Sequence, residues 1–189
     1  MPGPRRSDTE SVQCRHNGVV CHARQRWCRL RAGSTGTVNF ETGATRGMDL
    51  PQIWENRVRF EETDRQGIVF YGNYVTFQDE TITQYFRETG VGYPDIESRG
   101  WDVHVVNVEL NYHGQADVGD ELVHGARVDS FGTSSMTFEY AAHQADNGSR
   151  IADGTVTHVT VDPATGDPVR VPEEFRETVR RFQDEPPTE

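Results

Sequence analysis

Residues 64–74 of the chain read DRQGIVFYGNY, and this stretch decides how the sequence around it is interpreted. Asp64 and Gly67 are typical of a tight turn, because aspartate bonds its own backbone there and glycine accepts a positive φ. Asn73 is a good N-cap for a helix that begins at Tyr74. From Tyr74 onward, apolar side chains recur at three- and four-residue steps, and Gly90 is a stop signal. The pattern therefore predicts a helix over residues 74–89.

On both sides of this helix the hydrophobic period changes to two, which is typical of strands. Residues 57–61 alternate polar and apolar side chains and predict a half-buried strand. Further strands are predicted over residues 106–112, 121–129, 136–142 and 151–161. Residues 146–148 (DNG) form a hairpin turn between the last two strands, and Pro172 opens a short helix. One main helix with a run of antiparallel strands predicts an α+β fold.

The 189-residue chain has a formal net charge of −11, and all 19 of its basic side chains are arginine. Residues 1–47 contain eight arginines and three acids, net +5, whereas residues 48–189 contain 11 arginines and 27 acids, net −16. Because phosphates repel an acidic domain, we expect neither nucleic acid nor a membrane as a partner. The acidity and the missing lysines fit a halophilic-like acidic surface whose self-repulsion concentrated salt would screen. An arginine-biased genome would produce similar composition.

Residues 1–47 form a basic leader that we expect to be disordered, because no hydrophobic period persists in it. Three interpretations of the leader remain open. Cys14, Cys21 and Cys28 suggest a metal site, although their six-residue gaps do not match the usual spacing of zinc ligands. The arginine-rich composition also resembles a mitochondrial transit peptide. In the third interpretation Met48 is the true initiator, and the leader is untranslated or dispensable.

Residues 48–189 are expected to form one domain, since their 142 residues are close to the commonest domain size. This segment contains no cysteine, so a cytoplasmic location is expected. Its best candidate for chemistry is the carboxylate of Asp64, seven residues before Tyr71 near the predicted helix start. A helix start presents unpaired N–H groups to a developing oxyanion, and an aspartate acts as a nucleophile or general base. Alternatively, Asp64 only begins a turn and Gly67 only relieves backbone strain.

Residues 64–74 also resemble the signature of hotdog-fold acyl-CoA thioesterases of the 4-hydroxybenzoyl-CoA thioesterase type. That signature reads roughly Asp-x-x-Gly-[Ile/Val]-Val-[Phe/Tyr]-[Tyr/His]-x-Asn-Tyr, and the chain matches every specified position. The order of later segments is similar too, at residues 106–112, 119–122, 132–135 and 161–163. The resemblance covers about residues 55–172 and excludes the basic leader.

The resemblance implies a hotdog fold, in which a curved antiparallel sheet wraps a long central helix and the active site forms between two subunits. It implies a homodimer, or a tetramer built from two dimers, that hydrolyses an acyl-CoA without a metal or other cofactor. Asp64 corresponds to the catalytic carboxylate, and Tyr71 supplies the backbone N–H that polarises the thioester carbonyl. The remaining implied substrate contacts are Gly67, Ile68, Val69 and Phe70 in the acyl pocket, Asn73 near the helix start, and Thr133, Ser134 and Ser135 near the CoA phosphates.

Other interpretations use different residues. A carboxylate on the helix, Asp79 or Glu80, is the alternative catalytic acid, as in another hotdog branch. A hydratase is disfavoured because residues 73–90 contain no histidine. A non-catalytic protein that binds acyl-thioesters is the remaining alternative. The histidines of the predicted strands are expected to be exposed or locally bonded, and the two tryptophans of the domain core, Trp54 and Trp101, are expected to be packing groups.

Overall fold

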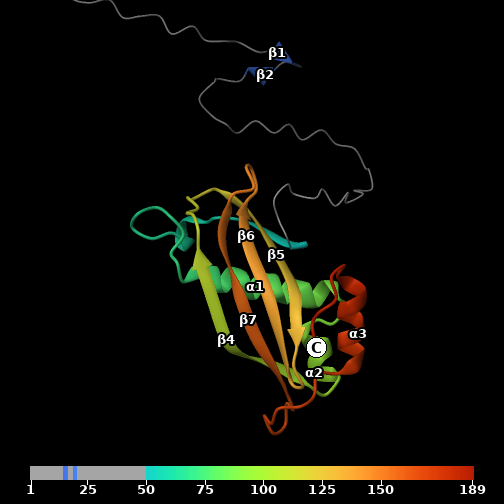
Figure 1. The fold of residues 1–189 in the computed structure, drawn as a ribbon. Coiled ribbons are helices and arrows are strands. Elements are labelled where there is room, and N and C mark those ends of the chain that lie inside the picture. Colours follow the sequence, from blue (N-terminus) through green and yellow to red (C-terminus); the bar gives the residue numbers. More distant parts are fainter. Residues whose placement is uncertain (1–14, 17–18, 21–49) are drawn as a thin grey trace, which may run out of the picture. The chain divides into compact units, whose positions relative to one another are not determined.

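The computed structural model describes residues 15–16, 19–20 and 50–189 (Figure 1). Residues 1–42 and 43–189 form two separate units. In the first unit, β1 (Arg15–His16) pairs with β2 (Val19–Val20) in antiparallel register. The three cysteines and the proposed Met48 start lie outside the described residues, so the interpretations of the leader stay predictions.

The second unit contains one antiparallel sheet with strand order β3-β5-β6-β7-β4, and the main helix α1 crosses one of its faces (Figure 1). The strands are β3 (Gln52–Arg57), β4 (Asp102–Tyr112), β5 (Glu121–Phe131), β6 (Ser135–Gln144) and β7 (Arg150–Val161). The helices are η1 (Phe60–Glu62), α1 (Asn73–Glu88), α2 (Tyr93–Ser98) and α3 (Glu173–Phe182). This arrangement confirms the α+β prediction.

Helix α1 confirms the predicted helix within one residue at each end. Its apolar stripe is buried against the sheet, and its C-terminus closes as a Schellman motif. In that motif Gly90, at φ +75°, donates to the Arg87 carbonyl, and Val91 donates to the Phe86 carbonyl at 3.0 Å. The predicted N-cap is wrong. Gly72 occupies that position without a side-chain cap, and Asn73 is the first helical residue.

The core divides into two clusters along α1. The cluster beneath its C-terminal half also contains α3 and centres on Tyr85, Phe86, Phe138 and Phe175. The cluster beneath its N-terminal half consists of Val58, Val69, Tyr74, Phe77, Ala116, Leu122, Tyr140, Ala142, Ile151 and Ala152. Each buried large side chain contributes roughly 1.5–3 kcal/mol of transfer free energy. Trp101 belongs to the first cluster and Trp54 packs on Phe77, so both predicted packing roles are confirmed.

The predicted strand over residues 57–61 is wrong. Strand β3 ends at Arg57, and the chain then turns through η1, which leaves Phe60 84% exposed. Arg59 and Glu62 close this turn, because the Arg59 N–H donates to Glu62 Oε2 at 2.7 Å and the guanidinium pairs with Oε1 at 2.7 Å. These local bonds outweigh the strand preference of the alternating side chains.

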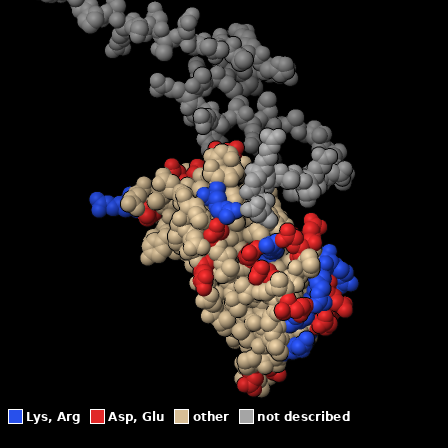
Figure 2. Space-filling model, viewed as in Figure 1, with Lys and Arg blue, Asp and Glu red and all other residues tan. Residues whose placement is uncertain are grey.

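Strand β4 confirms the predicted strand over residues 106–112, although its alternating apolar side chains are not buried. It is an edge strand, and Val105, Val106 and Val108 are 49%, 59% and 38% exposed. The space-filling view shows few charged side chains over β4 and β7, whereas charges gather over α3 (Figure 2). Strand β4 therefore leaves apolar side chains and one row of backbone groups uncovered by the rest of the described chain.

The predicted hairpin and C-terminal helix are confirmed. Strands β6 and β7 join through a loop closed by the Gln144 N–H, which donates to the Ser149 carbonyl at 2.9 Å. Gly148 has φ +71° in this loop, which is longer than the two-residue turn that the DNG motif favours. Pro172 directly precedes α3, as predicted. In the part of the chain that the structure describes, no helix is both long and apolar enough to span a membrane.

Candidate active site

The loop from Thr63 to Val69 is short, and an antiparallel bridge between these two residues closes it. The Asp64 N–H donates to the Ile68 carbonyl at 2.9 Å, and the Gly67 N–H donates to the Asp64 carbonyl at 3.0 Å. Gly67 has φ +84°, a conformation that strains any residue with a Cβ. The predicted turn at Asp64 and the strain relief at Gly67 are therefore confirmed, and both are compatible with catalysis.

The Asp64 carboxylate is half-buried at the start of this turn. Its Oδ1 accepts the Gln66 N–H at 2.7 Å, which fixes the carboxylate plane. No described residue donates to Oδ2. One carboxylate oxygen is thus held by the turn, and the other is available to attack a carbonyl carbon or to take a proton.

The start of α1 is anchored to the Glu62 carbonyl. That oxygen accepts the Phe70 N–H at 2.9 Å and the Asn73 Nδ2 at 2.7 Å. The Asn73 side chain therefore bonds the backbone just before the turn, and this bond is the physical reason that it does not cap the helix. The observed role of Asn73 is to position the turn.

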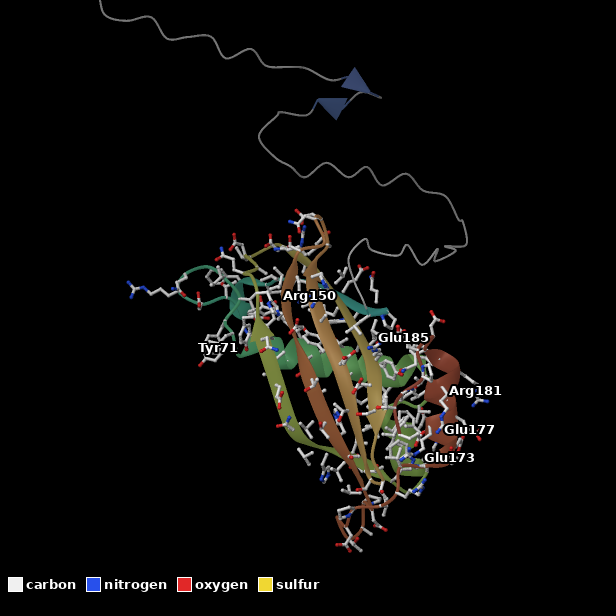
Figure 3. The ribbon with its side chains drawn as sticks, viewed as in Figure 1. Tyr71, Arg150, Glu173, Glu177, Arg181 and Glu185 are labelled. Carbon is white, nitrogen blue, oxygen red and sulfur yellow. The ribbon has the colours of Figure 1, made fainter. Side chains whose placement is uncertain are left out.

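Two backbone N–H groups remain at this helix start. The N–H groups of Asn73, Tyr74 and Val75 donate to the carbonyls of residues 70, 71 and 72. Those of Tyr71 and Gly72 have no acceptor among the described residues. Both lie at the end of α1 that carries the partial positive charge of the helix dipole. Tyr71 lies beside this end of the helix, with a side chain that is 66% exposed (Figure 3).

The structure separates the four predicted pocket residues. Val69 is 5% exposed and belongs to the core cluster beneath the N-terminal half of α1, and Ile68 is half-buried. Gly67 is exposed, and Phe70 is 44% exposed with its ring 4.4 Å from the Tyr71 ring. Phe70 and Tyr71 are therefore the large side chains of residues 67–71 that are exposed.

The predicted CoA contacts lie at the other end of the sheet. Thr133 and Ser134 connect β5 to β6, and their carbonyls accept the N–H groups of Val171 at 3.0 Å and Thr160 at 2.7 Å. The 11 residues of β5 separate this loop from the Asp64 end of the sheet. At 3.3 Å per residue that is roughly 30 Å. The fold of a single chain therefore does not bring Thr133, Ser134 and Ser135 to Asp64.

The alternative acids of the helix do not reach the turn either. Asp79 and Glu80 are exposed on α1, about 9 Å along its axis from Asn73. Partial burial, followed by the neighbouring Glu80 charge, raises the pKa of Asp79. This pair forms no contact with Asp64 in the described structure.

His158 contradicts the expectation that the histidines would be exposed or locally bonded, and His124 and His143 are buried as well. His124 is fully buried between the Tyr140 hydroxyl, 2.9 Å from Nδ1, and Asn56 Oδ1, 2.8 Å from Nε2. Burial, with a smaller effect of His143, lowers the pKa of His124 to about 3. His143 and His158 are each 2% exposed, and burial lowers the pKa of His158 to about 4. The sequence carried a signal for the burial of His158, because His158 alternates in a period-two pattern with Val156 and Thr160, which face inward.

The expectation holds for the other two strand histidines. His104 is exposed, and His113 lies 2.9 Å from the Asp153 carboxylate. Among the described residues, no three His, Cys, Asp or Glu side chains are grouped to hold a metal ion.

An open hollow of about 370 Å³ on the sheet is lined by residues that include Arg127 and Arg150 and do not include Asp64. Arg127 Nε is 2.8 Å from a Glu139 oxygen, and Arg150 Nη1 is 3.2 Å from an Asp153 oxygen. Because carboxylates compensate both guanidinium charges, the hollow does not offer a phosphate site.

Tyr112 is a site residue that sequence reasoning missed. It ends β4, and its hydroxyl donates to the Tyr71 carbonyl at 3.0 Å. Burial, with a smaller effect of Tyr71, raises the pKa of Tyr112. This contact joins residues 41 positions apart, so no local sequence pattern predicts it.

Comparisons with known proteins identify the family. The family model of the thioesterase-like superfamily matches residues 58–179 of this chain. A relative from Synechocystis is 27% identical over 58% of this chain and 66% of its own length. A relative from Aquifex aeolicus is also 27% identical, over 69% of this chain and 99% of its own length. The acyl-CoA thioester hydrolase YbgC of Escherichia coli O157:H7 is 25% identical over 119 residues, which are 63% of this chain and 88% of that protein.

Solved structures show the same fold. A hypothetical protein from Aquifex aeolicus matches with a TM-score of 0.61 and 26% identity, over 67% of this chain and 97% of that one. A 1,4-dihydroxy-2-naphthoyl-CoA thioesterase from Synechocystis matches with a TM-score of 0.62 and 17% identity, over 67% of this chain and 93% of that one. The predicted hotdog fold is confirmed. Since the family description covers more than half of the residues, the chain belongs to the thioesterase-like superfamily.

Proposed function

We propose that the protein is an acyl-CoA thioesterase, which hydrolyses an acyl- or aryl-CoA to the free acid and CoA. The observation that carries this proposal is the single turn in which a half-buried carboxylate, Asp64, precedes two unpaired N–H groups at the start of α1. Family membership and the names of the thioester hydrolase relatives support it.

In the proposed reaction the Tyr71 N–H donates to the thioester carbonyl oxygen as negative charge develops on it. Asp64 acts in one of two ways. As a nucleophile, its oxygen bonds to the carbonyl carbon, the C–S bond breaks, CoA leaves as a thiolate, and water hydrolyses the mixed anhydride. As a general base, Asp64 takes a proton from water, whose oxygen attacks the same carbon. The C–S bond then breaks, and the departing CoA thiolate takes up the proton that Asp64 holds. A thioester carbonyl has little resonance stabilisation, so neither route requires a cofactor.

We further propose that a second subunit completes the site through β4. Unpaired backbone groups and exposed valines make this edge a template for strand pairing. A two-fold axis would pair β4 with its copy in antiparallel orientation. Tyr112 lies at the Asp64 end of β4, and Asp102 lies at the end that carries Ser135, since β7 pairs with both strands there. Antiparallel pairing thus carries the partner's 133–135 loop toward Asp64, where it would contact the CoA phosphates.

The acyl pocket in this proposal lies between Phe70 of one subunit and the facing sheet of the other. Gly67 and Ile68 would contribute the loop around the reacting carbonyl, and Val69 would support it from the core. The cysteine-free acidic domain suits a reducing cytoplasm.

The test measures free thiol released from a panel of aryl-, short-chain and long-chain acyl-CoAs. Asp64→Asn keeps the turn but removes the charge, so we expect kcat to fall by about 10²–10⁴. Asp162→Asn is the matched control, because Asp162 Oδ1 accepts the Ala164 N–H at 2.7 Å in an equivalent turn outside the site. Near-full activity of Asp64→Asn would place the chemistry elsewhere. Stabilisation of the wild-type protein by CoA without thiol release would favour the non-catalytic binding protein.

A further inference from the structure

The peptide group between Tyr71 and Gly72 is held on its carbonyl side. The Tyr71 carbonyl oxygen accepts two hydrogen bonds, from the Tyr112 hydroxyl at 3.0 Å and from the Tyr74 N–H at 3.3 Å. The opposite side of the same peptide is the Gly72 N–H, which has no acceptor in the described part of the chain. A bond to the carbonyl polarises an amide and makes its N–H a stronger donor.

The Tyr112 ring is fixed well enough to aim its hydroxyl. It meets the buried Tyr74 ring edge to face, with centroids 5.6 Å apart and planes at 70°. Its backbone pairs with Ala152 in β7, so the position of Tyr112 is set by the sheet rather than by the turn. The hydroxyl therefore ties the end of β4 to the first turn of α1.

The Phe70 ring packs directly on the Gly72 backbone. A Cβ at Gly72 would lie 2.7 Å from Phe70 Cε1, so the exposed Phe70 ring would have to move to accommodate it. The conformation of Gly72, φ −65° and ψ −24°, is already helical. The Phe70 and Tyr71 carbonyls accept the N–H groups of Asn73 and Tyr74, as in a helical turn. Successive N–H groups of such a turn point toward its N-terminal side, so we expect those of Tyr71 and Gly72 to be directed together.

We propose that the Gly72 N–H is a second oxyanion donor beside that of Tyr71, and that Tyr112 is the positioning residue that orients and polarises it. The kinetic part of this inference rests on the proposed thioesterase function. Tyr112 touches no reacting atom and acts through the peptide that it holds.

Tyr112→Phe tests the inference, because it removes the hydroxyl and keeps the ring against Tyr74. We expect kcat for acyl-CoA hydrolysis to fall by about three- to thirty-fold with little change in KM, which is less than the loss of an oxyanion donor itself. Tyr85→Phe is the matched control: it removes a buried hydroxyl that bonds Gln183 Oε1 at 2.8 Å in the other core cluster. That variant should lose stability but keep kcat.

A spectroscopic measurement separates this inference from the proposed function. The ¹⁵N and ¹H resonances of the Gly72 amide should move in Tyr112→Phe and stay in place in Tyr85→Phe, whether or not a substrate is present. An unmoved Gly72 amide, or a moved amide with unchanged kcat, overturns the inference. If the wild-type protein releases no thiol from any acyl-CoA, the proposed function and the oxyanion role fail together, while the amide shift still reports the bond.

Discussion

Lowering the pH from 7 to 5 should destabilise the fold through two buried histidines, His124 and His158. His158 lies between the rings of Phe86 and Phe138, with centroid distances of 6.4 and 5.5 Å. Neither of its ring nitrogens has a hydrogen-bond partner among the described residues. Burial lowers the pKa of His158 from 6.5 to about 4 and that of His124 to about 3. Both imidazoles are therefore neutral in the folded protein at pH 5.

The sign and size of the effect follow from proton linkage. Between pH 6.5 and about 4 the unfolded chain binds a proton at His158 and the folded chain does not, so the stability falls as the pH falls. Each histidine changes the free energy of unfolding by about 1.4 kcal/mol per pH unit in this window. At pH 5 the loss is about 2 kcal/mol for each and about 4 kcal/mol for both. That is a large fraction of the roughly 5–15 kcal/mol typical of a domain.

Urea unfolding at pH 7, 6 and 5 measures this dependence in the wild-type protein and in His158→Leu. Leucine has a similar volume and no ring nitrogens to desolvate. The variant should therefore match or exceed the wild-type stability at pH 7, by up to about 3 kcal/mol. It should also lose about 1.4 kcal/mol per pH unit of the acid dependence. His104→Gln, at an exposed position of β4, is the control.

Two results would refute this reasoning. An unchanged pH slope in His158→Leu would mean that His158 takes up its proton equally in the folded and unfolded states. A loss of more than about 2 kcal/mol at pH 7 would mean that the ring makes a favourable polar interaction.

Three further predictions concern the fold, the edge strand and the charge. Gln183→Ala should lower the free energy of unfolding by about 2–4 kcal/mol in urea titrations, because the amide of Gln183 bonds the Tyr85 hydroxyl and both backbone groups of Val128. The control Gln66→Ala, at an exposed position, should change the free energy of unfolding little. If the proposed dimer pairs through β4, Val106→Arg should convert it to a monomer in sedimentation experiments, whereas the same change at exposed Val118, outside the strand, should not. A wild-type monomer would contradict pairing through β4. Raising KCl from about 0.05 to about 1 M should raise the melting temperature by screening the acidic domain, and an unchanged temperature would refute adaptation to salt.

Local patterns alone determined the elements whose causes lie within a few residues. The helix over residues 73–88 was predictable because its apolar stripe and the Gly90 stop are short-range signals. The turn at Asp64 was predictable for the same reason, since its bonds to Gln66 and Gly67 span two and three residues. The signature in residues 64–74 then placed the candidate site at the start of that helix.

The tertiary structure decided what depends on distant partners. The pattern of β4 predicts a buried face, but burial depends on whether another element covers the strand, and an edge position leaves it open. Periodicity carries no information about where a strand lies in a sheet.

The bond from Tyr112 to Tyr71 is the clearest case. The sequence separates these residues by 41 positions, and only the pairing of β4 with β7 brings the hydroxyl over the first turn of α1. The sequence by itself determined which turn carries the carboxylate and the free N–H groups. The sheet determined which side chain holds that turn, because a hydrogen bond requires a few ångströms of separation that only the folded chain provides.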